Sequence, residues 1–137
     1  SDLASLNFIY QSGFDSLGRP IIVFVASHLP AASASLDRVL LYIIKVLDPI
    51  VANDYNLIYF HTHISSHNKP PFKWLKEVYG IFNRKYKKNM KRLFLVHPTF
   101  WVKMVFWFAN PFVSKKFWKK LTYVEKLMDL YQHFDPQ

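Results

Sequence analysis

The sequence predicts an α/β domain with a mixed, mostly parallel sheet covered by helices. Short apolar runs of strand length occur at 20–25, 57–60, 93–96 and 121–124, and segments with helical patterns separate them. Alternating strands and helices are typical of parallel sheets with crossover helices. The 137 residues contain no internal repeat or linker-like stretch, so we expect residues 1–137 to form a single domain.

The first predicted element is a β-hairpin. Residues 8–10 lead into the turn-forming stretch 15–18, and the apolar strand 20–25 follows. This strand is hydrophobic without interruption, which indicates burial on both faces. After a loop rich in Ala, Ser and Pro over 28–35, we expect a largely buried helix over about 36–51. Pro49 should weaken the last turn of this helix.

The second half of the chain continues the alternation. Pro70 and Pro71 open a helix whose apolar face includes Phe72, and this helix lies between the strands 57–60 and 93–96. Thr99 is the expected N-cap of an aromatic helix over 100–109. A short basic helix over 114–119, the strand 121–124 and a last helix over 125–133 complete the prediction.

The net charge of +9 is concentrated in one segment. Residues 84–120 contain eleven Lys or Arg and no Asp or Glu, together with many of the aromatic residues. The run 84–92 has a simple interpretation as a solvated connection between a helix and a strand. Because the lysines of 115–120 extend the same charge, an anionic partner is also indicated: a membrane surface, an acidic protein or a nucleic acid.

Several classes of chemistry find no support in these residues. Cysteine is absent, the chain has three glycines, and neither a phosphate-binding glycine loop nor a Gly-x-Ser-x-Gly motif occurs. His61, His63 and His67 are candidate metal ligands, but a hydrogen-bonding role is favoured because a fourth ligand is not evident. We therefore expect no catalytic residues, no metal and no cofactor. No recognisable nucleic-acid motif occurs, so nucleic acid is not an expected partner.

Helix 100–109 is apolar around nearly its whole circumference. Such a helix is either buried on all sides or packs one face on the core and another on lipid. Phe106, Trp107 and Phe108 would form an exposed patch unless a partner or ligand covered them. The pattern alone leaves core packing and lipid contact both open.

The chain resembles a known family over nearly its whole length. Four stretches carry the resemblance: 18–24 (GRPIIVF), 53–61 (NDYNLIYFH), 66–70 (SHNKP) and 82–99 (FNRKYKKNMKRLFLVHPT). They resemble BCH domains, a divergent branch of the CRAL-TRIO family, and most of all the BCH module that precedes the catalytic domain of Rho GTPase-activating proteins. The related module of ganglioside-induced proteins is similar as well.

The resemblance implies a hydrophobic pocket between a sheet floor and a gate helix, which corresponds to 100–109. It implies a non-catalytic regulatory scaffold that binds Rho-type small GTPases, self-associates as a homodimer and modulates an attached GTPase-activating domain. The pocket would take a lipid or a prenyl tail. The expected location is cytoplasmic, with a peripheral place on endomembranes. The alternative function is a peripheral membrane or lipid-transfer module that binds anionic membranes.

Three sets of residues follow from these expectations. The expected lipid-binding residues of the gate helix are Phe100, Trp101, Met104, Val105 and Phe108. The residues expected to contact a GTPase are His28, Leu29, Asp37 and Arg38. The patch expected to face an anionic surface comprises Arg84, Lys85, Lys87, Lys88, Lys115, Lys116, Lys119 and Lys120.

Overall fold

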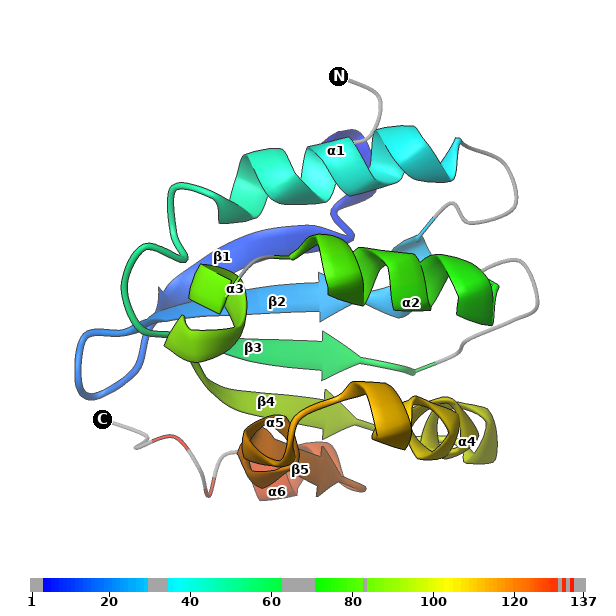
Figure 1. Ribbon diagram of the computed structural model, residues 1–137. Helices are drawn as coiled ribbons and strands as arrows, with labels where there is room; N and C mark the ends of the chain where they lie inside the picture. Colours follow the sequence, from blue (N-terminus) through cyan, green and yellow to red (C-terminus); the bar gives the residue numbers. More distant parts are fainter. Residues whose placement is uncertain are drawn as a thin grey trace.

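A computed structural model describes residues 4–29, 35–62, 71–82, 84–130, 132 and 134 (Figure 1). The strands are β1 (Ile9–Phe14), β2 (Pro20–Val25), β3 (Tyr55–Phe60), β4 (Met90–Val96) and β5 (Leu121–Val124). The α-helices are α1 (Leu36–Leu47), α2 (Phe72–Ile81), α3 (Arg84–Asn89), α4 (Phe100–Ala109), α5 (Lys115–Lys120) and α6 (Leu127–Leu130). Short 3-10 helices are η1 (Ala4–Leu6), η2 (Ala26–His28) and η4 (Asn110–Phe112).

The strands form one sheet in the order β1-β2-β3-β4-β5. β1 pairs antiparallel with β2, and the other neighbours are parallel, which confirms the predicted class. Helices α1 to α5 lie on one face of the sheet (Figure 1). This is expected because each parallel connection leads to the next strand in the same direction across the sheet, and such connections are nearly always right-handed. Helix α1, which connects β2 to β3, lies over β1 and contacts it.

Each face of the sheet has its own apolar core. On the helix-covered face, Ile22 and Leu93 pack with Val39 and Leu47 of α1. On the opposite face, Ile58 and Phe94 form a smaller cluster. This second cluster also contains Val96, Val124 and Leu130, with Phe134 packed against it. Alternation of side chains along each strand divides the apolar residues between the two cores, which explains the unbroken hydrophobic runs.

Helix α1 ends at Leu47, four residues before the predicted end. The Asp48 N–H still donates to the Ile44 carbonyl, but Pro49 has no N–H to continue the ladder. The N–H groups of Ile50 and Val51 both turn back to the Leu47 carbonyl. Proline therefore stops the helix here and does not merely weaken its last turn.

The caps of α4 and α5 follow the local sequence. The Thr99 hydroxyl accepts a hydrogen bond from the Val102 N–H, which confirms the predicted N-cap. Ser114 does the same for the Phe117 N–H at the start of α5. The last predicted helix, 125–133, is wrong in extent, because only Leu127–Leu130 is helical among the described residues there.

The basic run 84–92 connects α2 to β4 and exposes Lys85, Lys88 and Arg92, but it is not solvated throughout. It forms α3 and then the start of β4 at Met90, three residues earlier than predicted. Tyr86 is buried within the run and donates its hydroxyl to Asp48, while its ring lies against Phe82. Burial and the Asp48 carboxylate raise the pKa of Tyr86 to about 12. The buried Tyr86 thus ties α3 to Asp48 at the end of α1 and to Phe82 at the end of α2.

Candidate functional site

An apolar cavity of about 410 Å³ opens between α2 and α4. Its walls are Trp101, Met104, Val105 and Phe108 of α4, with Phe72 at the start of α2. The rings of Phe72 and Phe108 meet edge to face with centroids 6.4 Å apart. The volume lies within the range of about 300–1,000 Å³ typical of ligand pockets. Since every wall residue is apolar, the cavity suits a hydrocarbon chain.

Four of the five expected gate-helix residues line this cavity. Trp101, Met104, Val105 and Phe108 are spaced i, i+3, i+4 and i+7, which places them on one helical face. The prediction for Phe100 is not supported, because this residue does not line the cavity and is 78% exposed. Phe72 was not among the predicted wall residues, although helical periodicity places it on the apolar face of its helix.

A stack of rings joins the cavity to the sheet. Trp101 stacks on His61 with ring centroids 5.6 Å apart, and His61 stacks on Tyr59 at the same spacing. Tyr59 in turn stacks on Phe24 at 5.5 Å. His61 is 1% exposed, and its Nδ1 lies 3.0 Å from the Tyr59 hydroxyl. The position of α4 is therefore tied to two strands of the sheet.

The histidines weighed as a metal site are only partly described. His61 lies in the ring stack, whereas His63 and His67 lie outside the described residues. Within the described part of the chain, no three His, Asp or Glu side chains gather in a way that could hold a metal ion. His61 instead packs between the rings of Tyr59 and Trp101, with its Nδ1 within hydrogen-bonding distance of the Tyr59 hydroxyl.

The outer side of α4 carries exposed aromatic residues. Trp107 is 72% exposed, and Phe108 and Phe112 are about half exposed. Phe106 faces inward, where its ring contacts Phe117 and Trp118 of α5. Helix α4 thus has a cavity face, a face against α5 and an exposed aromatic face, and neither full burial nor full exposure describes it.

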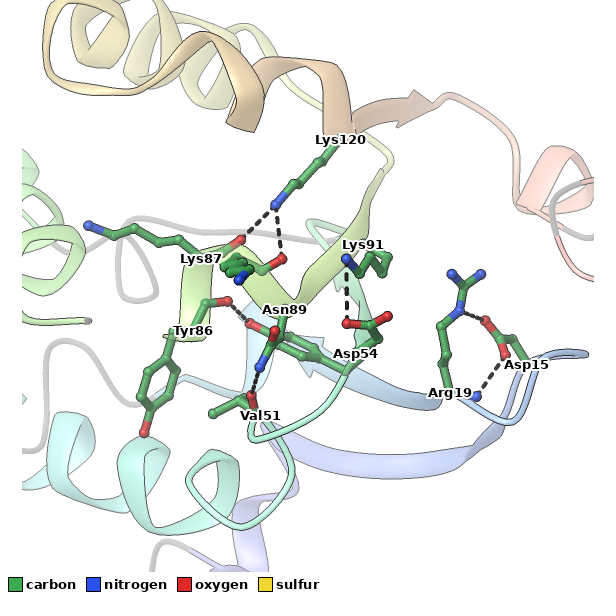
Figure 2. A network of polar contacts seen from close by, with 11 residues as sticks. Asp15, Arg19, Val51, Asp54, Tyr86, Lys87, Asn89, Lys91 and Lys120 are labelled. Carbon is green, nitrogen blue, oxygen red and sulfur yellow. Dashed lines mark hydrogen bonds and ion pairs between the residues drawn. The ribbon is translucent and has the colours of Figure 1, made fainter. Parts of the chain in front are cut away.

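Lys120 joins the two halves of the basic segment. Its ammonium group donates to the Lys87 carbonyl at 2.7 Å and lies 3.5 Å from the Lys88 carbonyl, as Figure 2 shows. These carbonyls end α3, where a cation interacts favourably with the helix dipole. Burial lowers the pKa of Lys120, and the nearby charges of Lys91 and Lys116 lower it further. Lys120 is therefore a helix cap, and its ammonium is not available as the exposed charge that was expected.

The other expected basic residues differ in their surroundings. Lys85 forms an ion pair with Asp48 at 3.5 Å, and the Lys87 ammonium lies 4.0 Å from the centre of the Tyr79 ring. The side chain of Arg84 lies outside the described residues. Lys88, Lys115, Lys116 and Lys119 are exposed. Lys91, which was not among the predicted residues, is partly exposed and pairs with Asp54 at 3.4 Å, and its charge contributes to the lowered pKa of Lys120.

The residues expected to contact a GTPase are divided between surface and core. His28 is exposed, and its Nδ1 lies 3.3 Å from the Asn7 carbonyl oxygen. Asp37 and Arg38 are exposed in the first turn of α1. Leu29 is 4% exposed and packs in the core, so the prediction that it contacts a GTPase is not supported.

Comparison with known proteins places the chain in a family. The family model for the divergent CRAL/TRIO domain matches residues 18–137. The chain is 52% identical over 133 residues to the Rho GTPase-activating protein gacY of Dictyostelium discoideum, with 97% of this chain and 18% of that protein covered. It is 48% identical over 114 residues to the GDAP2 homolog of Drosophila melanogaster, with 83% and 21% covered.

The chain thus spans about a fifth of the length of these curated relatives. Among solved structures, the crystal structure of Sfh5 superposes with a TM-score of 0.75 at 15% identity, covering 96% of this chain and 51% of that one. This likeness shows a shared fold. Among the described helices, none is long and apolar enough to cross a bilayer. The family match over most of the chain and the 52% identity agree, and this chain belongs to the divergent CRAL/TRIO family.

Proposed function

We propose that this domain is a non-catalytic regulatory module of a Rho GTPase-activating protein. It binds a Rho-type small GTPase and accepts an acyl or prenyl chain in the cavity between α2 and α4. The observation that carries the proposal is the purely apolar wall of Phe72, Trp101, Met104, Val105 and Phe108. This wall lies in a chain that is 52% identical to a segment of a Rho GTPase-activating protein.

The lining supports a hydrocarbon chain as the ligand. Each methylene group that enters the cavity from water contributes about 0.8 kcal/mol. Since the lining contains no charged side chain, a charged head group would gain nothing inside and would remain at the mouth. A prenyl group at the end of a GTPase meets this requirement, because its protein anchor remains in solvent.

The test measures the affinity of the domain for a Rho GTPase, prenylated or not, with the nucleotide state fixed. Val105→Trp should fill part of the cavity and reduce the affinity for the prenylated form to that of the unprenylated form. Phe100→Trp is the matched control, because it adds an indole to the same helix at an exposed position outside the cavity. If Val105→Trp retains the full advantage of the prenyl group, the cavity is not the prenyl site.

Self-association belongs to the same proposal. The exposed aromatic residues Trp107, Phe108 and Phe112 offer an apolar surface that a second copy would cover. In a protein that carries a GTPase-activating domain beside this one, such a dimer and the bound GTPase would together restrain that catalytic domain. Light scattering over a range of protein concentrations tests self-association. A mass of 16.3 kDa at every concentration would show that the domain is monomeric and would contradict this part of the proposal.

A second function, peripheral membrane binding, is favoured by the same aromatic surface. Aromatic side chains favour the bilayer interface, and each Lys near an anionic surface contributes about 1 kcal/mol. In that case the domain would sediment with anionic vesicles, and Trp107→Ser would release it. This location would place the protein in the cytoplasm at endomembranes.

A further inference from the structure

A second, larger groove lies at the opposite end of the strands from the apolar cavity. It has a volume of about 720 Å³ and lies between the β1–β2 hairpin and the loop after α1. The groove is bordered by the starts of β2, β3 and β4, whereas α4 follows the end of β4. The seven residues of β4 separate the two sites by about 20 Å. A ligand of this groove therefore binds independently of a chain held beside α4.

The lining of the groove combines apolar and polar residues. Phe14 at the end of β1 is 64% exposed, and Pro20, Pro49 and Ile50 extend its apolar surface. The polar lining residues are Gln11, Arg19, Asn53, Asp54 and Asn89. Their primary amides both donate and accept hydrogen bonds, as peptide groups do. The lining therefore suits a ligand that carries apolar side chains together with peptide groups.

Two irregularities of the sheet border this groove. The register of β1 shifts between Gln11 and Phe14, where Gly13 adopts a positive φ of 68°. The register of β4 shifts as well, since Tyr55 faces Met90 while Asn56 faces Arg92, and this leaves Lys91 as the extra residue. Bulges redirect side chains and are frequent next to binding sites. Here one bulge lies beside the Phe14 wall, and the other accompanies the contact of Lys91 with Asp54.

Arg19 is held in a fixed direction beside the groove. Its Nε donates to Asp15 Oδ2 at 2.6 Å, and Asp15 also accepts from the Arg19 backbone N–H at 2.8 Å. The terminal nitrogens of the guanidinium point away from Asp15 in Figure 2. The Arg19 side chain is 30% exposed. The planar fork of these two nitrogens matches the two oxygens of a carboxylate, and its orientation is already fixed.

A second cation lies across the sheet edge from Arg19. Continuing the β2–β3 register by two residues beyond Ile21–Asn56 places Arg19 next to Asp54, one strand spacing of about 4.8 Å away. On the next strand, Lys91 Nζ lies 3.4 Å from Asp54 Oδ1, and both side chains are partly exposed. Such an exposed pair is weak, so Lys91 can leave Asp54 at small cost.

Two further lysines make this end of the sheet more positive. Burial lowers the pKa of Lys120, and the charges of Lys91 and Lys116 lower it further, so these three ammonium groups lie within electrostatic reach of one another. With Arg19 they form a group of four cations, of which two are paired with a carboxylate. The remaining positive charge favours an anionic partner. A single carboxylate occupies the fork of Arg19, and Asp54 in the lining repels a second negative charge on the same group.

From this arrangement we infer that the groove binds an extended, acidic peptide segment of a partner protein, in which a Glu or Asp side chain stands next to an apolar residue. The carboxylate of the peptide pairs with both terminal nitrogens of Arg19, and Lys91 leaves Asp54 to contact it. The apolar neighbour packs on the ring of Phe14. The amide of Gln11 bonds to a peptide group beside the carboxylate.

The test is a titration of the domain with dye-labelled, capped heptapeptides, followed by fluorescence anisotropy. The probe mixture carries Glu at the centre and mixed Leu, Val and Phe on either side. Two reference mixtures replace this Glu by Gln or by phosphoserine. Saturable binding of the Glu mixture, about tenfold or more tighter than that of the Gln mixture, supports the proposal. Equal binding of the Glu and Gln mixtures, no binding of either, or tighter binding of the phosphoserine mixture overturns it.

Two variants with matched controls locate the peptide in the groove. Arg19→Lys keeps the charge but loses the planar fork, and it should weaken binding of the Glu mixture about tenfold. Arg38→Lys makes the same exchange at an exposed position of α1. Phe14→Ala should weaken binding about fivefold by removing the apolar wall. Its control is Leu17→Ala, which shortens an exposed apolar side chain of the same hairpin outside the groove lining.

A third variant tests the charge within the groove. Asp54→Asn should strengthen binding about threefold or more by removing a repelling carboxylate, with exposed Asp37→Asn in the first turn of α1 as its control. Circular dichroism establishes that each variant is folded before its affinity is compared. If the three variants and their controls change binding equally, the attraction is diffuse and the groove is not a site. Val105→Trp should leave peptide binding unchanged, so this inference and the proposed prenyl site can fail separately.

Discussion

Asp15 is the residue whose replacement should do most to weaken the hairpin. Its carboxylate, 6% exposed, accepts hydrogen bonds from the backbone N–H of Leu17 and of Arg19 at 2.9 and 2.8 Å. It also accepts from Arg19 Nε and, at 2.8 Å, from Asn56 Nδ2 in β3. A single side chain thus holds the turn together and ties it to the middle of the sheet.

Asp15→Ala should lower the free energy of unfolding by about 2–4 kcal/mol. Asn56 is 2% exposed, and its orphaned amide alone costs about 1–3 kcal/mol. The two backbone donors lie near solvent and add about 0.5–1 kcal/mol together. The Arg19 ion pair adds little more, because the Arg19 side chain is partly exposed. Asp15→Asn is the milder control, since it retains an acceptor for the turn and loses the charge.

Urea unfolding followed by tryptophan fluorescence measures this change. Hydrogen bonds from Arg19, Asn56 and Leu17 outweigh the effect of burial and lower the pKa of Asp15. The contribution of the ionised carboxylate is therefore complete above the unfolded-state pKa of about 3.9 and disappears as pH falls through the lower folded-state pKa. The difference between wild type and Asp15→Asn should shrink below about pH 4. A loss below about 0.5 kcal/mol for Asp15→Ala at pH 7 would refute this account.

Two further substitutions test the helix ends. Lys120→Met should destabilise the protein by about 1 kcal/mol at neutral pH by removing the cation at the end of α3, with exposed Lys119→Met as the control; equal losses in urea unfolding would contradict the capping role. Thr99→Ala should cost about 1 kcal/mol by removing the N-cap of α4, and Thr99→Ser should restore most of it. If hydrogen exchange in the first turn of α4 is the same in all three proteins, the cap has no such effect.

Much of the fold could be predicted from local pattern. The apolar runs of β2 and β4 and the N-cap at Thr99 are signals contained within a few residues. The same holds for four of the five cavity residues, because a stripe at 101, 104, 105 and 108 follows directly from helical periodicity. Phe72 could not be assigned to the cavity in this way, since its contact with Phe108 depends on how α2 and α4 pack.

Features that depend on distant residues were not predictable. Lys120 looks like any surface lysine in the sequence, and only the end of α3, more than thirty residues away, makes it a cap. The bulge at Lys91 depends on its pairing with β3, and the burial of Leu29 depends on α1 and the sheet. Basic charge is visible in the sequence, but the assignment of each charge to an ion pair, a cap or solvent is a tertiary property.

The order of strands bears on how the chain folds. Each strand pairs with the strand that precedes it in sequence, so every new pairing closes only the short segment made since the last one. The β1–β2 hairpin can form first, and each following helix and strand can then add to a growing edge. As the nascent chain emerges from the ribosome, each strand after β1 would find its preceding neighbour already in place.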